Sequence, residues 1–198
     1  MRTACILLFY LLVAGCNTSA YQKQKDLLEA DQWGQLTQEK AEFYAAADVS
    51  PDVVVLTKEW HEIGTRAWGN YGPLEFWIVG SSPSAAKELE KKYVAVRIQK
   101  DNSVSREAYE DRDHGFVSYA KEGNAGLGLI RNEYEKWSGY IITMSSKSPS
   151  PIEEDYKPVL LHEYFHVYQN AHIHSRDIGE RASRSQENPW WTEGGAEY

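Results

Sequence analysis

The sequence predicts a single α+β domain, and its two clearest strands and the order of its elements carry that prediction. Residues 73–80 (PLEFWIVG) and 139–145 (GYIITMS) are apolar runs rich in aromatic or β-branched residues, which is typical of buried strands. Helical periodicity is expected before, between and after them. In a parallel βαβ fold, strands and helices alternate strictly. The elements expected here do not, so an α+β arrangement is favoured.

The first half of the chain is expected to be mainly helical outside the strand at 73–80. Residues 21–47 are interpreted as a helical layer with a break near Trp33-Gly34, because Gln, Lys and Glu give it a polar outer face. Ser50-Pro51 is a typical helix start, with Ser as the N-cap and Pro in the first turn. That helix should end near Gly69-Asn70. Ser82-Pro83 repeats the start signal for a helix over 85–98.

The second half combines irregular segments with one long apolar helix. Residues 101–138 carry several charges, and the glycine-rich stretch 123–128 (GNAGLG) is interpreted as a turn or loop, since it has no phosphate-loop lysine. Residues 146–151 form the next expected loop. A helix should then begin near 155–158 and run to about Gln169, followed by a polar loop over 173–188.

The N-terminus has the pattern of an export signal. Arg2 precedes an unbroken apolar run over 4–14, which is shorter than the roughly 17–25 residues that span a bilayer. The following Val-Ala-Gly-Cys ending at Cys16 resembles the lipobox of bacterial lipoproteins. The resemblance implies a signal over 1–15, a lipidated Cys16 with a short tether over 16–20, and a domain over 21–198. A plain signal peptide, with Cys16 incidental, is the alternative.

Charge and cysteine content limit the partners and the kind of metal site. The formal net charge is −8, and no basic run is present, so a nucleic-acid partner is not expected. Asn17 follows the lipobox cysteine where an Asp favours the inner membrane, so an outer-membrane or periplasmic location is expected. Cys5 leaves with the signal and Cys16 is acylated. A metal site must therefore use His and carboxylate ligands.

A zinc-site pattern lies in the long apolar helix. His162, Glu163 and His166 form H-E-x-x-H, whose i,i+4 spacing puts both imidazoles on one helix face, one turn apart. Glu163 projects about 100° round the helix from His162, where it can reach a metal-bound water as a general base. The alternative is a pair of core histidines that hydrogen-bond within the protein. A metal is favoured because histidines in a core helix need partners.

Two residues downstream are candidates for the third ligand. His172 has the spacing of a metzincin ligand, but Gln169 stands where that pattern requires glycine. The helix should then continue and carry His172 roughly 9 Å along its axis beyond His166, out of reach of a shared ion. His172 and His174 are therefore interpreted as exposed residues after the helix. The second candidate is Glu193.

Glu193 lies in the closing segment 189–198 (PWWTEGGAEY). H-E-x-x-H followed by W-x-x-E-G-x-A-E-Y resembles the gluzincin superfamily, and most closely the bacterial peptidase-MA-like families. The resemblance implies that His162, His166 and Glu193 bind one zinc ion. It further implies that Glu163 is the catalytic base and that Glu197 orients His162 through a hydrogen bond.

The resemblance covers mainly residues 139–198 and sets further expectations. It implies a zincin-like domain with a small twisted sheet, an active-site helix and the N-terminal helical layer. The strand at 139–145 should offer its edge to an extended peptide. Gluzincins continue with a helical subdomain, so this domain, ending at Tyr198, is expected to lack it and to be incomplete at its C-terminus.

The expected function is that of a lipid-anchored zinc metallopeptidase acting on peptides or proteins, with membrane attachment through Cys16. The competing class is a non-catalytic lipoprotein, built on the same scaffold, that holds zinc or binds peptides or glycans. The 13 Tyr and 7 Trp residues favour that class, whereas the intact H-E-x-x-H favours the enzyme. A lipoprotein with buried histidines and no metal is a third reading.

Overall fold

The computed structural model describes residues 36–100, 105–132, 137–146, 156–173 and 189–196. The predicted signal, Cys16, the helix over 21–35, His174 and Glu197 lie outside the described residues, as do most of the loops expected at 146–151 and 173–188. Within the described ranges, no helix has the length and apolar character needed to cross a membrane.

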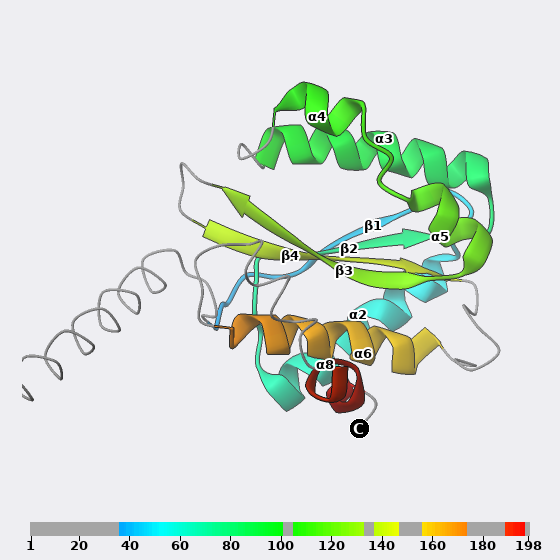
Figure 1. Cartoon of the computed structure of the whole chain (residues 1–198). Coiled ribbons are helices and arrows are strands. Elements are labelled where there is room, and N and C mark those ends of the chain that lie inside the picture. The colour runs from blue at the N-terminus through cyan, green and yellow to red at the C-terminus, as the bar shows by residue number, and fades with distance from the viewer. Residues whose placement is uncertain (1–35, 101–104, 133–136, 147–155, 174–188, 197–198) are drawn as a thin grey trace, which may run out of the picture.

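The described residues form one mixed sheet covered by helices on both faces (Figure 1). Its order is β1-β2-β4-β3, in which β1, β2 and β4 are parallel and β3 is antiparallel to β4. The strands are β1 (Glu42–Ala45), β2 (Leu74–Val79), β3 (Ala125–Asn132) and β4 (Trp137–Ser145). The helices are α2 (Pro51–Trp68), α3 (Pro83–Lys100), α4 (Arg106–Glu110), α5 (Phe116–Glu122), α6 (Tyr156–Ala171) and α8 (Pro189–Ala196). The expectation of a mixed α and β domain is confirmed.

The helix start and stop signals in the first half are confirmed. Helix α2 begins at Pro51, and the Ser50 hydroxyl accepts a hydrogen bond from the Asp52 backbone N–H at 3.3 Å. It ends before Gly69, whose positive φ of 101° suits glycine, and whose N–H donates to the Thr65 carbonyl. Strands β2 and β4 and helices α3 and α6 also lie where the sequence predicts them.

The predicted helix over 21–47 is wrong where the structure describes it. Residues 42–45 form β1, parallel to β2. The Phe43 ring stacks on Phe76 with centroids 5.0 Å apart, and Tyr44 stacks on Trp77 at 4.0 Å. These cross-strand aromatic pairs stabilise a strand against the helical preference of the polar residues around them.

The interpretation of 123–128 as a turn or loop is correct for Gly123 and Asn124 but wrong from Ala125 onward, where β3 begins. Ala125, Leu127 and Leu129 pack against the core under the sheet, which is the two-residue period of a strand. Gly126 lies between them on the other side. A Cβ there would be 2.8 Å from the Tyr119 hydroxyl, so the glycine makes room for that phenol.

The strand predicted at 139–145 does not offer a free edge. Strand β4 pairs with β2 on one side and with β3 on the other, so its backbone hydrogen bonds are used within the sheet. In the described sheet, β3 is the strand at the end next to β4. The expectation that 139–145 forms an open edge is therefore wrong, because β3, which was not predicted, pairs with it.

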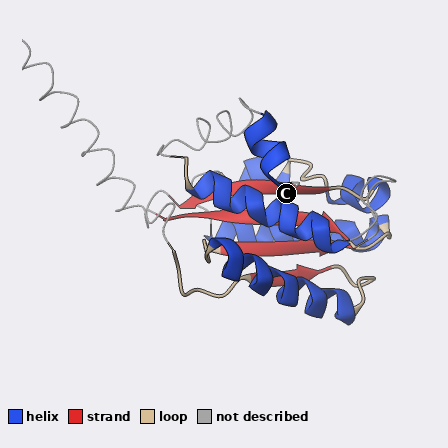
Figure 2. Cartoon of the chain, turned by 90° about the horizontal axis from the view of Figure 1, so that it is seen from below, coloured by secondary structure: helices blue, strands red, loops and turns tan. Residues whose placement is uncertain are grey.

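Helices α2 and α6 lie side by side under the sheet and run roughly along its strands (Figure 2). They cross closely at Gly64, where a Cβ would be 2.6 Å from the Tyr164 ring. The buried Tyr164 hydroxyl donates to the Gly69 carbonyl at 2.7 Å, and the Thr57 and Tyr156 hydroxyls are hydrogen-bonded at 2.9 Å. These contacts fix α6, which carries the H-E-x-x-H residues.

Candidate metal centre

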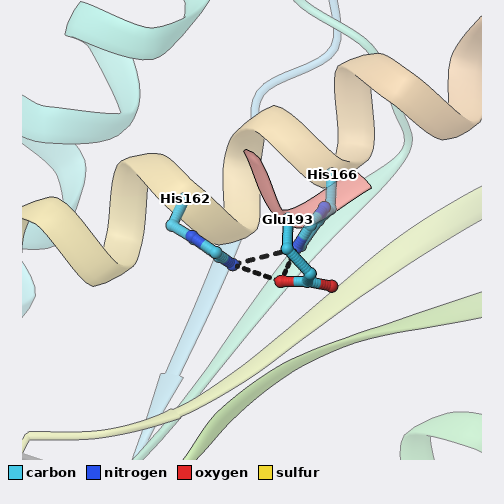
Figure 3. Close-up of side chains that lie close together, drawn as sticks. All are labelled: His162, His166 and Glu193. Atoms are coloured by element: carbon cyan, nitrogen blue, oxygen red, sulfur yellow. Dashed lines mark hydrogen bonds and ion pairs between the residues drawn. The ribbon is translucent and has the colours of Figure 1, made fainter. Parts of the chain in front are cut away.

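Helix α6 places His162 and His166 one turn apart with their rings facing the same point (Figure 3). Their Nε2 atoms are 3.0 Å apart. The helix forms here because Leu160, Tyr164 and Val167 bury one face against the sheet and α2. The two histidines lie beside that face and are only 15% and 12% exposed.

Glu193 reaches the two histidines from α8, which packs against α6 (Figure 3). Its Oε2 is 3.3 Å from Nε2 of His162 and 3.7 Å from Nε2 of His166. The approach of the two helices depends on Gly195, where a Cβ would be 3.0 Å from the Phe165 ring. The glycine therefore lets α8 lie close enough to present Glu193 to the histidines.

The three donor atoms fit a tetrahedral zinc ion. With zinc–ligand distances of about 2.0–2.1 Å, neighbouring ligands of a tetrahedron are about 3.3 Å apart. The distances among His162, His166 and Glu193 are 3.0, 3.3 and 3.7 Å, which scatter about that value. Within the described part of the chain, this is the group of His, Cys, Asp and Glu residues arranged to hold a metal ion.

The protonation state of His166 suits metal binding. Burial lowers its pKa, and the neighbouring His162 acts in the same direction, whereas Gln169 and Glu193 oppose the shift. The imidazole is therefore neutral at pH 7, which is the form that binds a metal ion. The carboxylate of Glu193 adds the negative charge that a divalent cation favours.

Gln169 is a residue of this site that sequence reasoning treated only as a departure from the metzincin glycine. The Nδ1–H of His166 donates to its side-chain oxygen at 2.8 Å, and Gln169 is 1% exposed. The signal available in the sequence was its i+3 spacing from His166, which puts the two side chains on one helix face.

Glu163 follows His162 in α6 and is buried. Its side chain projects about 100° round the helix from His162. The Tyr119 phenol of α5 lies within electrostatic range of this carboxylate, because the pKa of Tyr119 is raised by burial and further by Glu163. The sequence did not single out Tyr119, which lies 44 residues before Glu163.

His172 is exposed and lies outside the three-residue group, as expected. Its Nδ1–H donates to the Tyr168 carbonyl at 2.7 Å, and its ring lies against those of Tyr168 and Tyr71. Helix α6 continues through Gln169 to Ala171, which is the physical reason the metzincin geometry does not form.

The chain matches no protein-family model, no curated protein and no solved structure.

Proposed function

We propose that this chain is a zinc-dependent metallopeptidase, held at a membrane by lipids on Cys16. The observation that carries the proposal is the convergence of His162, His166 and Glu193 from two helices at zinc-ligand distances. The buried Glu163 follows His162 in the same helix. The resemblance of the two motifs to gluzincins supports the same assignment, with one zinc ion per chain.

The chemistry follows from the residue types. Zinc, when bound, supplies a water of lowered pKa and polarises the peptide carbonyl. Glu163 accepts a proton from the attacking water and then donates it to the departing amine. Its buried position favours this role, because a carboxylate that is shielded from bulk water exchanges protons with the reacting groups.

The substrate is a peptide or protein bound as an extended strand. Strand β3 lies at the end of the described sheet and also contacts α6. A peptide that pairs with β3 would therefore run past the helix that carries His162 and Glu163. This assigns to β3 the role that the sequence alone gave to the strand at 139–145.

The first experiment measures zinc per chain by elemental mass spectrometry. About one zinc is expected in the wild type and almost none in His162→Ala, because two ligands do not retain the ion. His172→Ala is the matched control, since it removes an exposed histidine next to the same helix and should keep the zinc. A folded wild type without zinc would overturn the proposal in favour of a histidine pair joined by a hydrogen bond.

The second experiment separates the enzyme from a non-catalytic zinc-holding or peptide- or glycan-binding protein. Glu163→Gln keeps the shape of the side chain but cannot accept the proton. It should retain zinc and lose peptide cleavage by roughly 100-fold or more. A peptide library and casein, read by mass spectrometry, supply the substrates. Zinc without any cleavage by the wild type would favour the binding protein.

Membrane attachment is tested separately. Cys16→Ser should move the protein from the membrane pellet to the soluble fraction, because the thiol that carries the acyl chains is lost. Membrane association that survives this change would contradict the lipid anchor and leave the zinc site unaffected.

A further inference from the structure

The hydrogen bond between His166 and Gln169 gives Gln169 a role beyond packing. Resting on the proposed zinc site, we propose that Gln169 is a positioning residue that holds His166 in the tautomer whose Nε2 binds the metal. The role acts through His166, whose Nδ1 lies 2.8 Å from the Gln169 side-chain oxygen.

The geometry selects one tautomer. A neutral imidazole carries one N–H, and the Nδ1–H of His166 donates to the Gln169 oxygen at 2.8 Å. The lone pair is then on Nε2, which lies 3.0 Å from Nε2 of His162 and 3.7 Å from Oε2 of Glu193. In the other tautomer, the Nε2–H of His166 would point at the metal position. The lone pair of Nδ1 would then face a lone pair of the Gln169 oxygen.

The Gln169 side chain is itself held in place. It is 1% exposed, and its amide nitrogen lies 3.3 Å from the position that a Cβ on Gly195 would occupy. The amide is therefore packed between His166 and α8, the helix that carries Glu193. A packed acceptor orients the imidazole before the metal arrives, so little side-chain entropy is lost on binding.

An amide suits this position better than a charged acceptor for a neutral ligand. A carboxylate at the same place would also accept from Nδ1–H, but would stabilise a positively charged imidazole. Gln169 fixes the proton on Nδ1 without adding charge. The role of Gln169 therefore depends on its side-chain oxygen as an acceptor. A substitution that removes this oxygen should weaken metal binding, whereas one that keeps an oxygen should not.

The test compares Gln169→Leu with Gln169→Glu in the full chain. Gln169→Leu removes the acceptor and should weaken zinc binding roughly 10–100-fold in competition with a chelator. Gln169→Glu keeps the acceptor and should bind zinc within about threefold of the wild type. Equal zinc affinity of Gln169→Leu and the wild type would overturn the role of Gln169 and leave the zinc site standing.

Nitrogen-15 NMR of the metal-free protein gives a readout that packing alone does not change. In the wild type and in Gln169→Glu the His166 ring should carry its proton on Nδ1, whereas Gln169→Leu should show a mixture of tautomers. A wild-type ring protonated mainly on Nε2 would overturn the proposal even if Gln169→Leu does not fold. Absence of zinc from the wild type would instead overturn the metal site itself.

Discussion

Acid should destabilise this fold through His61, a buried histidine of α2 outside the metal centre. His61 is 8% exposed, and among the described residues its Nε2 has no hydrogen-bond partner. Its ring lies edge-on to Phe43, Phe76 and Tyr164, with centroids 5.0–6.1 Å apart. Burial among these rings lowers the pKa of His61 to about 4. Because Tyr164 belongs to α6, protonation of His61 also disturbs a contact that holds the helix of His162 and His166.

The sign and size of the effect follow from linkage. The unfolded chain binds the His61 proton with a pKa of about 6.5, whereas the folded chain does so only near 4. The stability that comes from keeping His61 neutral is therefore fully present above about pH 6.5. It is lost as the pH falls towards 4, because the unfolded chain then binds the proton more tightly than the folded one. Relative to neutral pH, the loss amounts to about 2 kcal/mol at pH 5 and about 3 kcal/mol at pH 4.

Urea denaturation of the wild type and of His61→Leu measures this loss. The leucine cannot titrate, so the difference in unfolding free energy between the two proteins should move by about 2 kcal/mol between about pH 7 and pH 5. His172→Asn is the control, because it replaces an exposed histidine, and surface substitutions usually change stability by no more than about 0.5 kcal/mol. A constant difference between the wild type and His61→Leu down to pH 4 would refute the reasoning.

Two further substitutions test the contacts that build the site. Gly195→Ala should weaken zinc binding roughly tenfold in chelator competition, because its Cβ, 3.0 Å from Phe165, pushes α8 and its carboxylate away from α6. Unchanged zinc affinity of Gly195→Ala would count against the packing argument. Tyr164→Phe loses the 2.7 Å hydrogen bond to Gly69 and should lower the free energy of unfolding in urea by about 1 kcal/mol. Unchanged stability would mean that this bond contributes nothing net.

Local signals were enough for the elements that depend on their own sequence. Ser50, Pro51 and Gly69 predicted the ends of α2, because caps act within a single helical turn. The apolar residues spaced through 159–167 predicted the buried helix α6. The i,i+4 spacing of His162 and His166 then fixed their common face, since helix geometry alone decides it.

Strands β1 and β3 could not be predicted, because their stability comes from neighbours distant in the sequence. Phe43 is held by Phe76 of β2, and Gly126 lies in a strand because Leu127 next to it packs under the sheet. A short segment does not carry this information, and polar residues or glycines around it indicate a helix or a turn. The free edge of the sheet was therefore assigned to the wrong strand.

For the candidate site, too, one part follows from the local sequence and another part only from the tertiary structure. The sequence by itself determined that His162 and His166 share one helix face, and it predicted His and carboxylate donors for a metal. Only the structure showed that Gln169 contacts His166. The motif resemblance predicted that Glu193, 27 residues beyond His166, joins the two histidines, and the tertiary structure decided how it reaches them. The physical reason is the close packing of α8 on α6 at Gly195, a contact between helices that no local pattern encodes.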